Sequence, residues 1–305
     1  MSAIGASPSV GVGDAVFVAN VRSLMSAEWL DGAERKLRDR GLNLKETFRS
    51  ANVGELCHHA EQAASEGRLV IVGGGDGTLS AVADRLRRTD AVMGVLPLGT
   101  GNAFARDLSI PTDLDQAIDV IAGGRRLAVD VGICDGRCFL NVVTIGLTAT
   151  VARSLTVPLK RRFGRFVYAA AVLKALRNIH PFTAKIESDN GVTEIRAVQL
   201  VVGNGRFHGG PLPLTPEASI VDSVLKLYAV EAAGKWELLK FAALLPVGMQ
   251  GSLRTVHSEE CTRGTVSATP AQAVVIDGEI ADKTPFHFAI EPGSLNVIVP
   301  EDFAR

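Results

Sequence analysis

Short apolar runs alternate with amphipathic stretches along the first third of the chain. The apolar runs predict strands bounded by turn residues, at 14–20, 42–48, 68–72 and 91–99. The stretches with helical periodicity predict helices between these strands, at 27–41, 53–67 and 79–86. Strands that alternate with helices in this way indicate a parallel sheet covered on both faces.

The pattern changes near 125–130, where short apolar runs separated by turns take over. These runs predict antiparallel strands, at 127–136, 137–146, 182–191, 192–205, 223–232 and 273–279. We expect two helices inserted among them, near 163–178 and 234–245, and a strand at 292–300 that returns to the first domain. The predicted division is an α/β domain over 1–128, with 293–305 returning to it, and a β-rich substrate domain over 129–292.

Composition narrows the class of protein. The 305 residues are 47% hydrophobic and 21% charged, which is typical of a globular chain with one or two domains. A net charge of −1 and an aromatic content of 5% argue against a nucleic-acid partner. No apolar stretch reaches the roughly 18 residues of a membrane span, and the first residues lack the pattern of a signal peptide. We expect the four cysteines to be structural thiols in a reducing cytoplasm.

The stretch LVIVGGGDGTL, at 69–79, places glycines and one acid at the end of a buried strand. Glycines let the backbone turn its N–H groups toward an anion, and the positive end of a following helix adds to this effect. The loop therefore suits phosphates, although it has neither the lysine of a P-loop nor the spacing of a dinucleotide fingerprint. Asp76 beside phosphates suggests phosphoryl transfer, as a metal-linked group or as a base. The alternative is a tight turn in which Asp76 caps the next helix.

A second loop repeats the same composition. PLGTGNAFARDL, at 97–108, also joins a strand end to a predicted helix through glycines, a hydroxyl and Asn102. Two such loops at neighbouring strand ends are hard to explain as turns alone. The pair therefore favours a phosphate-binding site over the turn alternative.

The two loops in this order resemble the diacylglycerol kinase catalytic-domain superfamily, which includes bacterial lipid kinases, diacylglycerol kinases and sphingosine kinases. VVGNGRFHGGPLPLTPEASIVDSVLKL, VVIDGEI and LNVIVP also resemble the family's later motifs. The resemblance implies an α/β domain like that of NAD kinase and phosphofructokinase, followed by an antiparallel β-sandwich domain. It also implies transfer of the γ-phosphate of ATP to a hydroxyl, usually on a lipid, with Mg²⁺ as cofactor.

The resemblance assigns site residues one by one. It places nucleotide phosphates and Mg²⁺ against the first loop, at Gly74, Gly75, Asp76, Gly77 and Thr78, and lines the same cleft with Gly99, Thr100, Gly101 and Asn102. It adds to the nucleotide site Asn20, Ser23, either Thr47 or Ser50, and Asp277. It makes Asp76 and Glu279 the candidate catalytic acids. It also implies a structural Mg²⁺ site at Asp222 with the backbone oxygens of Ser219 and Val224.

The chain also departs from the family pattern. The loop after the first predicted strand reads NVRSL, at 20–24, without the family's proline and glycine. Ala103 stands where diacylglycerol kinases usually have aspartate, Ala81 where many members have glutamate, and Ser223 where glycine is common. The missing acids leave the Mg²⁺ network and the identity of the lipid open.

A basic segment precedes one of the inserted helices, with Lys160, Arg161, Arg162 and Arg165. It could dock on anionic lipid headgroups, or it could be the solvated start of a core helix. We expect a cytoplasmic lipid kinase that contacts the inner face of the membrane peripherally. Two other hypotheses stay open: a kinase for a soluble hydroxyl compound, and a nucleotide-binding regulatory protein that no longer catalyses. A homodimer is also left open.

Overall fold

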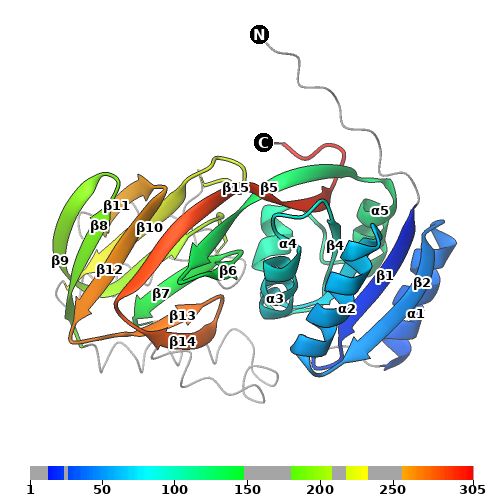
Figure 1. Ribbon diagram of the computed structural model, residues 1–305, viewed down its shortest axis with the longest axis horizontal. Helices are drawn as coiled ribbons and strands as arrows, with labels where there is room; N and C mark the ends of the chain where they lie inside the picture. The colour runs from blue at the N-terminus through cyan, green and yellow to red at the C-terminus, as the bar shows by residue number, and fades with distance from the viewer. Residues whose placement is uncertain (1–12, 24–26, 148–179, 208–217, 233–255, 305) are drawn as a thin grey trace, which may run out of the picture.

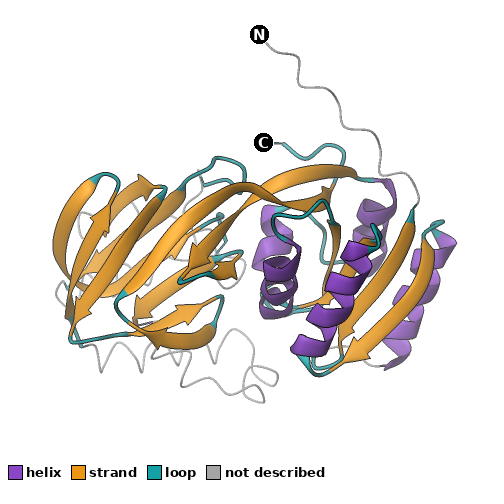
Figure 2. Cartoon of the chain, viewed as in Figure 1, coloured by secondary structure: helices purple, strands orange, loops and turns teal. Residues whose placement is uncertain are grey.

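Figure 1 shows two halves side by side, an α/β half on the right and a β-rich half on the left. The computed structural model describes residues 13–23, 27–147, 180–207, 218–232 and 256–304. The predicted inserted helices and the basic segment lie outside the described residues, at 163–178, 234–245, Lys160, Arg161, Arg162 and Arg165. Figure 2 shows that the described helices all belong to the α/β half. The predicted fold class is confirmed.

The α/β half contains a parallel sheet in the order β4-β3-β1-β2. Its strands are β1 (Asp14–Asn20), β2 (Asn43–Ser50), β3 (Leu69–Gly74) and β4 (Val92–Pro97). Its helices are α1 (Ala27–Asp39), α2 (Val53–Ser65), α3 (Asp76–Leu86), α4 (Ala103–Asp107) and α5 (Leu114–Gly123). Every residue of β3 is buried, because helices cover the sheet on both faces.

Two helices differ from the prediction. α3 begins at Asp76, three residues before the predicted start at Leu79, because glycines are tolerated in a first turn whose N–H groups have no partner within the helix. α5 was not predicted, although its signal is present. The Asp113 side chain accepts a hydrogen bond from the Gln116 N–H at 3.1 Å, which is a normal N-cap.

The β-rich half is antiparallel. Its strands are β6 (Arg137–Phe139), β7 (Val142–Gly146), β8 (Phe182–Ser188), β9 (Gly191–Gly203), β10 (Leu225–Glu231), β11 (Val256–Cys261), β12 (Arg263–Thr269), β13 (Ala273–Ile276) and β14 (Glu279–Lys283). The strands β11 and β12 escaped prediction because each buries only one residue fully, so neither shows an apolar run. The single strand predicted at 137–146 divides at Leu140 and Asn141, whose N–H groups donate to Asp277 instead of to a strand.

Two long strands join the halves. β5 (Arg125–Cys134) and β15 (Phe286–Val299) pair along most of their length and run across the top of Figure 1. The first part of β15 pairs with β12, and its last part pairs in parallel with β4, with Asn296 opposite Val92. One hydrogen-bonded sheet therefore continues from the β-rich half into the α/β half. Among the described residues, no helix has the length and apolar character that crossing a membrane requires.

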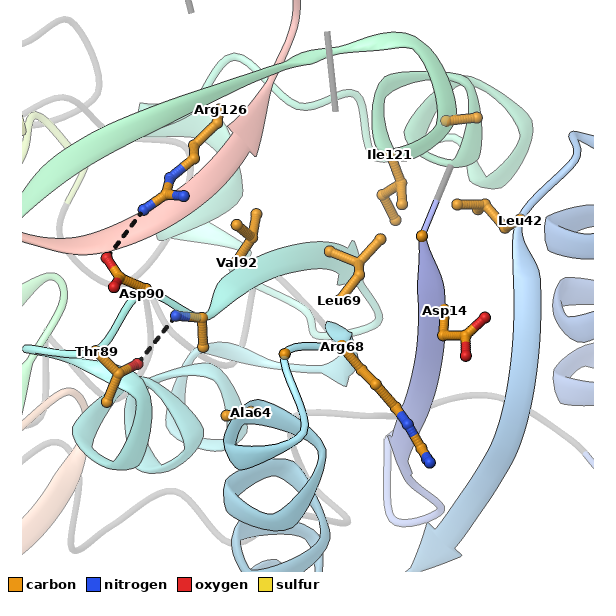
Figure 3. Close-up of a pocket in the computed structure, with 14 residues that line it drawn as sticks. Asp14, Leu42, Ala64, Arg68, Leu69, Thr89, Asp90, Val92, Ile121 and Arg126 are labelled. Atoms are coloured by element: carbon orange, nitrogen blue, oxygen red, sulfur yellow. Dashed lines mark hydrogen bonds and ion pairs between the residues drawn. The ribbon is translucent and has the colours of Figure 1, made fainter. Parts of the chain in front are cut away.

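A groove of about 290 Å³ lies at the amino ends of β1, β3 and β4 (Figure 3). Leu69, Val92 and Ile121 point into it, and Arg68 and Arg126 lie at its rim. Arg68 is ion-paired with Glu46 and Glu66, and Arg126 lies 3.7 Å from Asp90. This groove is at the edge of the sheet opposite the glycine loops, and both arginines already have acidic partners.

Candidate active site

The carboxyl ends of three strands meet at one edge of the parallel sheet. The strand register places Ala19 of β1 beside Gly73 of β3, and Gly74 of β3 beside Pro97 of β4. The loops that follow β1, β3 and β4 therefore leave the sheet side by side. This edge is where parallel α/β sheets bind their ligands.

The two glycine loops touch through their backbones. A Cβ atom added to Gly99 would lie 2.7 Å from the Cα of Gly75 and 2.8 Å from the Oδ1 of Asn102. Asn102 adopts a left-handed conformation with φ of 49°, and its Oδ1 accepts a hydrogen bond from the Gly99 N–H at 2.8 Å. Only glycine fits at this contact, so the two loops form one continuous backbone surface. Gly101 and the exposed Thr100 complete the second loop.

Asp76 is the first residue of α3, and its side chain reaches from the loop after β3 to the helix that follows the other glycine loop. Its Oδ1 accepts a hydrogen bond from the N–H of Phe104, in the first turn of α4, at 3.2 Å. Burial is the largest influence on this carboxyl and raises its pKa; the charge of Asp277 also raises it, while the bond from Phe104 lowers it. A carboxylate with a raised pKa is a better proton acceptor near neutral pH.

Glu279 enters the same site from the β-rich half. It follows a tight turn in which Asp277 and Gly278 have φ of 44° and 89°, the conformation that an Asp-Gly pair favours. Its Oε1 lies 3.4 Å from the position that a Cβ on Gly77 would take, so it faces the first turn of α3. Its Oε2 accepts a hydrogen bond from Arg137 Nη2 at 2.7 Å. Arg137 is not among the residues predicted from the sequence, because nothing local to β6 indicates that its side chain reaches Glu279 at the start of β14.

Asp277 connects the two halves behind the site. Its carboxylate accepts hydrogen bonds from three consecutive N–H groups, at Leu140 (2.8 Å), Asn141 (3.0 Å) and Val142 (2.8 Å). It also accepts one from the hydroxyl of Ser80, on α3. Burial raises the pKa of Asp277, and these bonds oppose that effect. The side chain thus fixes the turn that carries Glu279; direct nucleotide contact by Asp277 stays a prediction.

The loop that follows β1 lies against the glycine loop that follows β3, through Asn20. Asn20 Nδ2 donates to the hydroxyl of Thr78 at 2.8 Å, and the Ser23 hydroxyl donates to the backbone oxygen of Asn20. On the neighbouring strand, Ser50 is the last residue of β2 and pairs with Asn20. Thr47 lies further back in β2, and its hydroxyl donates to Glu34. The register therefore favours Ser50 over Thr47 as the hydroxyl at the edge.

The predicted structural metal site centres on Asp222, between the residues described up to Phe207 and strand β10. The Asp222 carboxylate accepts hydrogen bonds from the N–H groups of Ser219 (3.1 Å) and Val224 (3.2 Å), and Lys226 lies 3.4 Å away. These N–H donors and the ammonium group engage both carboxylate oxygens, so no metal is needed to satisfy them. Ser223 has φ of 62°, which explains why glycine suits this position. Metal binding here stays a prediction.

One further acid lies close to the loops. Asp107, the last residue of α4, is only 8% exposed, and its carboxylate accepts a hydrogen bond from the Arg206 N–H at 2.8 Å. The pKa of Asp107 is raised from 3.8 to about 7. Burial is the largest cause and the charge of Asp76 adds to it, while the N–H bonds from Arg206 and Phe207 and the charge of Arg206 oppose the shift.

This shift predicts a pH-dependent stability. Between pH 4 and about 7 the native state binds more protons at Asp107 than the unfolded state does, so the free energy of unfolding falls as the pH rises and is level above this window. Asp107→Asn removes this contribution. We expect the stability of the wild type relative to the variant to decrease by about 2 kcal/mol between pH 5 and pH 8, measured by urea unfolding. A difference that does not change with pH would contradict the buried carboxyl's raised pKa.

Comparisons with known proteins identify the family of the chain. Residues 14–134 match the family model for the diacylglycerol kinase catalytic domain, and residues 141–299 match the YegS C-terminal NAD kinase beta sandwich-like domain. A protein from Enterobacter sp. (strain 638) named "Probable lipid kinase YegS-like" is 30% identical over 283 residues, covering 90% of this chain and 92% of its own. The diacylglycerol kinase of Bacillus subtilis (strain 168) is 27% identical over 263 residues, covering 85% and 87%.

Solved structures extend the comparison to the fold. A crystal structure of a diacylglycerol kinase from Bacillus anthracis str. Sterne superposes with a TM-score of 0.78 at 23% identity, covering 94% of this chain and 96% of that one. At this identity the likeness shows the shared fold. The matching family models and the sequence relatives supply the rest: the chain belongs to the bacterial diacylglycerol kinase and YegS-like lipid kinase family.

Proposed function

We propose that this protein transfers the γ-phosphate of ATP to a hydroxyl of a diacylglycerol-like lipid. One observation carries the proposal: two phosphate-type loops touch at Gly75 and Gly99, and carboxylates from both halves of the molecule, Asp76 and Glu279, converge on them. Family membership supports a lipid as acceptor. The family's lipid kinases and the arrangement of the acids favour a catalytic protein over one that only binds a nucleotide.

The glycine loops hold the phosphates of ATP. Their close backbone contact leaves no room for side chains, so the N–H groups that follow β3 and β4 can approach phosphate oxygens directly. The Asn20–Thr78 hydrogen bond and the Asn102–Gly99 hydrogen bond hold the loops in place before ATP arrives. Preorganised donors of this kind orient and stabilise a transferring phosphoryl group.

The acids of the cleft fit Mg²⁺. This ion is usually held by one or two carboxylates together with substrate phosphates, and Glu279 would supply one of them. Within the described part of the chain there is no cluster of three or more acidic, histidine or cysteine side chains that would form a complete protein cage. Mg²⁺, when bound, would neutralise phosphate charge. Glu279, held by Arg137, is placed to contact the ion.

Asp76 is placed to take the proton. The acceptor oxygen attacks the γ-phosphorus, the bond between that phosphorus and the ADP oxygen breaks, and the hydroxyl proton passes to the Asp76 carboxylate. Its raised pKa suits this role, and the Phe104 N–H keeps one carboxylate oxygen in a fixed direction. The lipid approaches from the side of the β-rich half, where Glu279 and Arg137 lie.

The test is transfer of label from γ-labelled ATP to diacylglycerol in mixed micelles, with Mg²⁺, for wild type beside Glu279→Gln. We expect labelled phosphatidic acid from the wild type, and a loss of turnover of about 10²-fold in the variant with a higher Mg²⁺ requirement. Glu187→Gln changes an exposed glutamate of β8 that is ion-paired with the neighbouring Lys185, and it is the matched control. ATP binding without transfer to any lipid would contradict the proposal, and transfer to glycerol alone would favour a soluble acceptor.

Membrane contact is a separate part of the proposal. The candidate surface is the basic segment with Lys160, Arg161, Arg162 and Arg165, which lies outside the described residues. Co-sedimentation with vesicles that contain anionic phospholipid measures it. We propose that replacing these four residues by glutamine lowers vesicle binding and leaves activity on short-chain, dispersed diacylglycerol unchanged.

A further inference from the structure

The short helix α4 touches the candidate catalytic acid at one end and the β-rich half at the other. Its Phe104 N–H donates to Asp76 at 3.2 Å. Its last residue, Asp107, accepts hydrogen bonds from the N–H groups of Arg206 (2.8 Å) and Phe207 (3.5 Å), in the loop that follows β9. A single turn of helix therefore connects Asp76 to the β9 loop, which we define as Asn204–Phe207.

The β9 loop is shaped to receive this carboxylate. A Cβ added to Gly205 would lie 2.2 Å from Asp107 Oδ2, so no other residue fits at this position while the carboxylate stays in place. The loop is also fixed on its far side. Asn204 Nδ2 donates to the backbone oxygens of Asp130 (3.0 Å) and Leu140 (3.1 Å), and Arg206 Nε donates to the backbone oxygen of Ala218 (2.9 Å).

Nothing within α4 favours an acid at this position. A negative charge at the last residue of a helix opposes the helix dipole, and burying a carboxylate costs free energy unless donors surround it. Asp107 is 8% exposed, and the donors that it has come from the β9 loop. The acid therefore serves the contact between the halves rather than the helix.

We propose that Asp107 is a positioning residue that fastens the β9 loop to α4 and thereby holds Asp76 in its working direction. This inference rests on the proposed function of Asp76. The loops that hold ATP phosphates depend on other contacts, at Gly75, Gly99 and Asn102. Loss of the Asp107 contact should therefore impair phosphoryl transfer and leave ATP affinity intact.

The experiment compares Asp107→Ala, Gly205→Ala and the double variant. We expect each single variant to lower kcat by about 10- to 100-fold, because a displacement near 1 Å of a catalytic group has effects of this size. We expect the dissociation constant of ATP to stay unchanged. Because both substitutions break one contact, the double variant should be no slower than the slower single variant. Asp119→Ala, which removes an exposed carboxylate paired with Arg40, is the matched control.

Amide hydrogen exchange gives a readout that does not need activity. Both variants should exchange faster at Arg206 and Phe207, with β1 and β3 unchanged. Three results would each overturn the inference. The first is faster exchange in the variants without any fall in kcat. The second is a double variant whose loss of kcat is the product of the two single losses, and the third is a loss of ATP affinity that parallels the loss of kcat.

If the wild type itself transfers no phosphate while the variants show the expected exchange pattern, the proposed function fails and the contact between Asp107 and the β9 loop stands. Asp107→Asn is the alternative if Asp107→Ala does not fold, because it keeps one acceptor oxygen. Its kcat should lie between those of the wild type and Gly205→Ala. A kcat equal to that of the wild type in both Asp107→Asn and Gly205→Ala would overturn the inference.

Discussion

Asp76→Asn is expected to reduce phosphoryl transfer by about 10³-fold or more while ATP still binds. A positioned general base contributes roughly 10²- to 10⁴-fold, and Asn cannot take a proton from the acceptor. The amide oxygen of Asn can still accept the hydrogen bond from the Phe104 N–H, so α4 should stay in place. The variant also removes a buried charge, so we expect its thermal stability to equal or exceed that of the wild type.

The measurement is single-turnover transfer from γ-labelled ATP, together with ATP binding by calorimetry. Asp90→Asn is the control: it makes the same chemical change at a fully exposed acid on the opposite edge of the sheet. Turnover by Asp76→Asn close to that of the control would remove Asp76 from the chemistry. Loss of both ATP binding and stability would assign it a structural role instead.

The second large effect is expected for Gly99→Ala. The added Cβ would lie 2.7 Å from the Gly75 Cα and 2.8 Å from Asn102 Oδ1, and a backbone atom cannot move aside without moving its loop. Overpacking of this kind costs about 1–3 kcal/mol of stability. Because both loops would separate, we also expect ATP affinity to fall by about tenfold or more, which corresponds to about 1.4 kcal/mol.

Gly123→Ala is the matched control for Gly99→Ala. Gly123 lies at the end of α5, its φ is not positive, and an added Cβ would have no atom within 4 Å. Alanine there should leave ATP affinity unchanged and the free energy of unfolding unchanged or slightly higher. Calorimetric titration of ATP and urea unfolding give both quantities. An unaltered ATP affinity in Gly99→Ala would contradict the proposal that the touching loops hold the phosphates of ATP.

Local sequence predicted the four parallel strands of the α/β half and the loops that follow β3 and β4, although it missed α5. The apolar runs of β1, β3 and β4 are strong signals, and the rule that parallel strands share a carboxyl edge brings their loops together. Asp76 follows from this reasoning without any knowledge of the second half. Even here the start of α3 was misplaced, because Gly77 in a helix contradicts propensity unless it lies in the first turn.

The remaining contacts depend on how the two halves meet, which no local pattern encodes. Arg137 and Glu279 lie on strands far apart in the sequence, and neither shows its partner in its own surroundings. The contact between Asp107 and Gly205 is equally hidden in the sequence, because the acid lies in PLGTGNAFARDL and the glycine in VVGNGRF, about 100 residues later. The resemblance to a family located Asp277 and Glu279, but only the geometry separates the residue that anchors the turn from the residue that faces α3.

The path of β15 has a consequence for how this chain is made. On one side β4 pairs with β3, and on the other it pairs with Asn296 and Val297 of β15. These two residues leave the ribosome only after the whole β-rich half has been synthesised. Until then the nascent α/β half has an open strand edge, and such edges invite pairing with other chains. Sheet closure across so long a sequence separation is also intrinsically slow. We therefore expect the α/β half to complete its folding late, once β15 has been synthesised and can pair with β4.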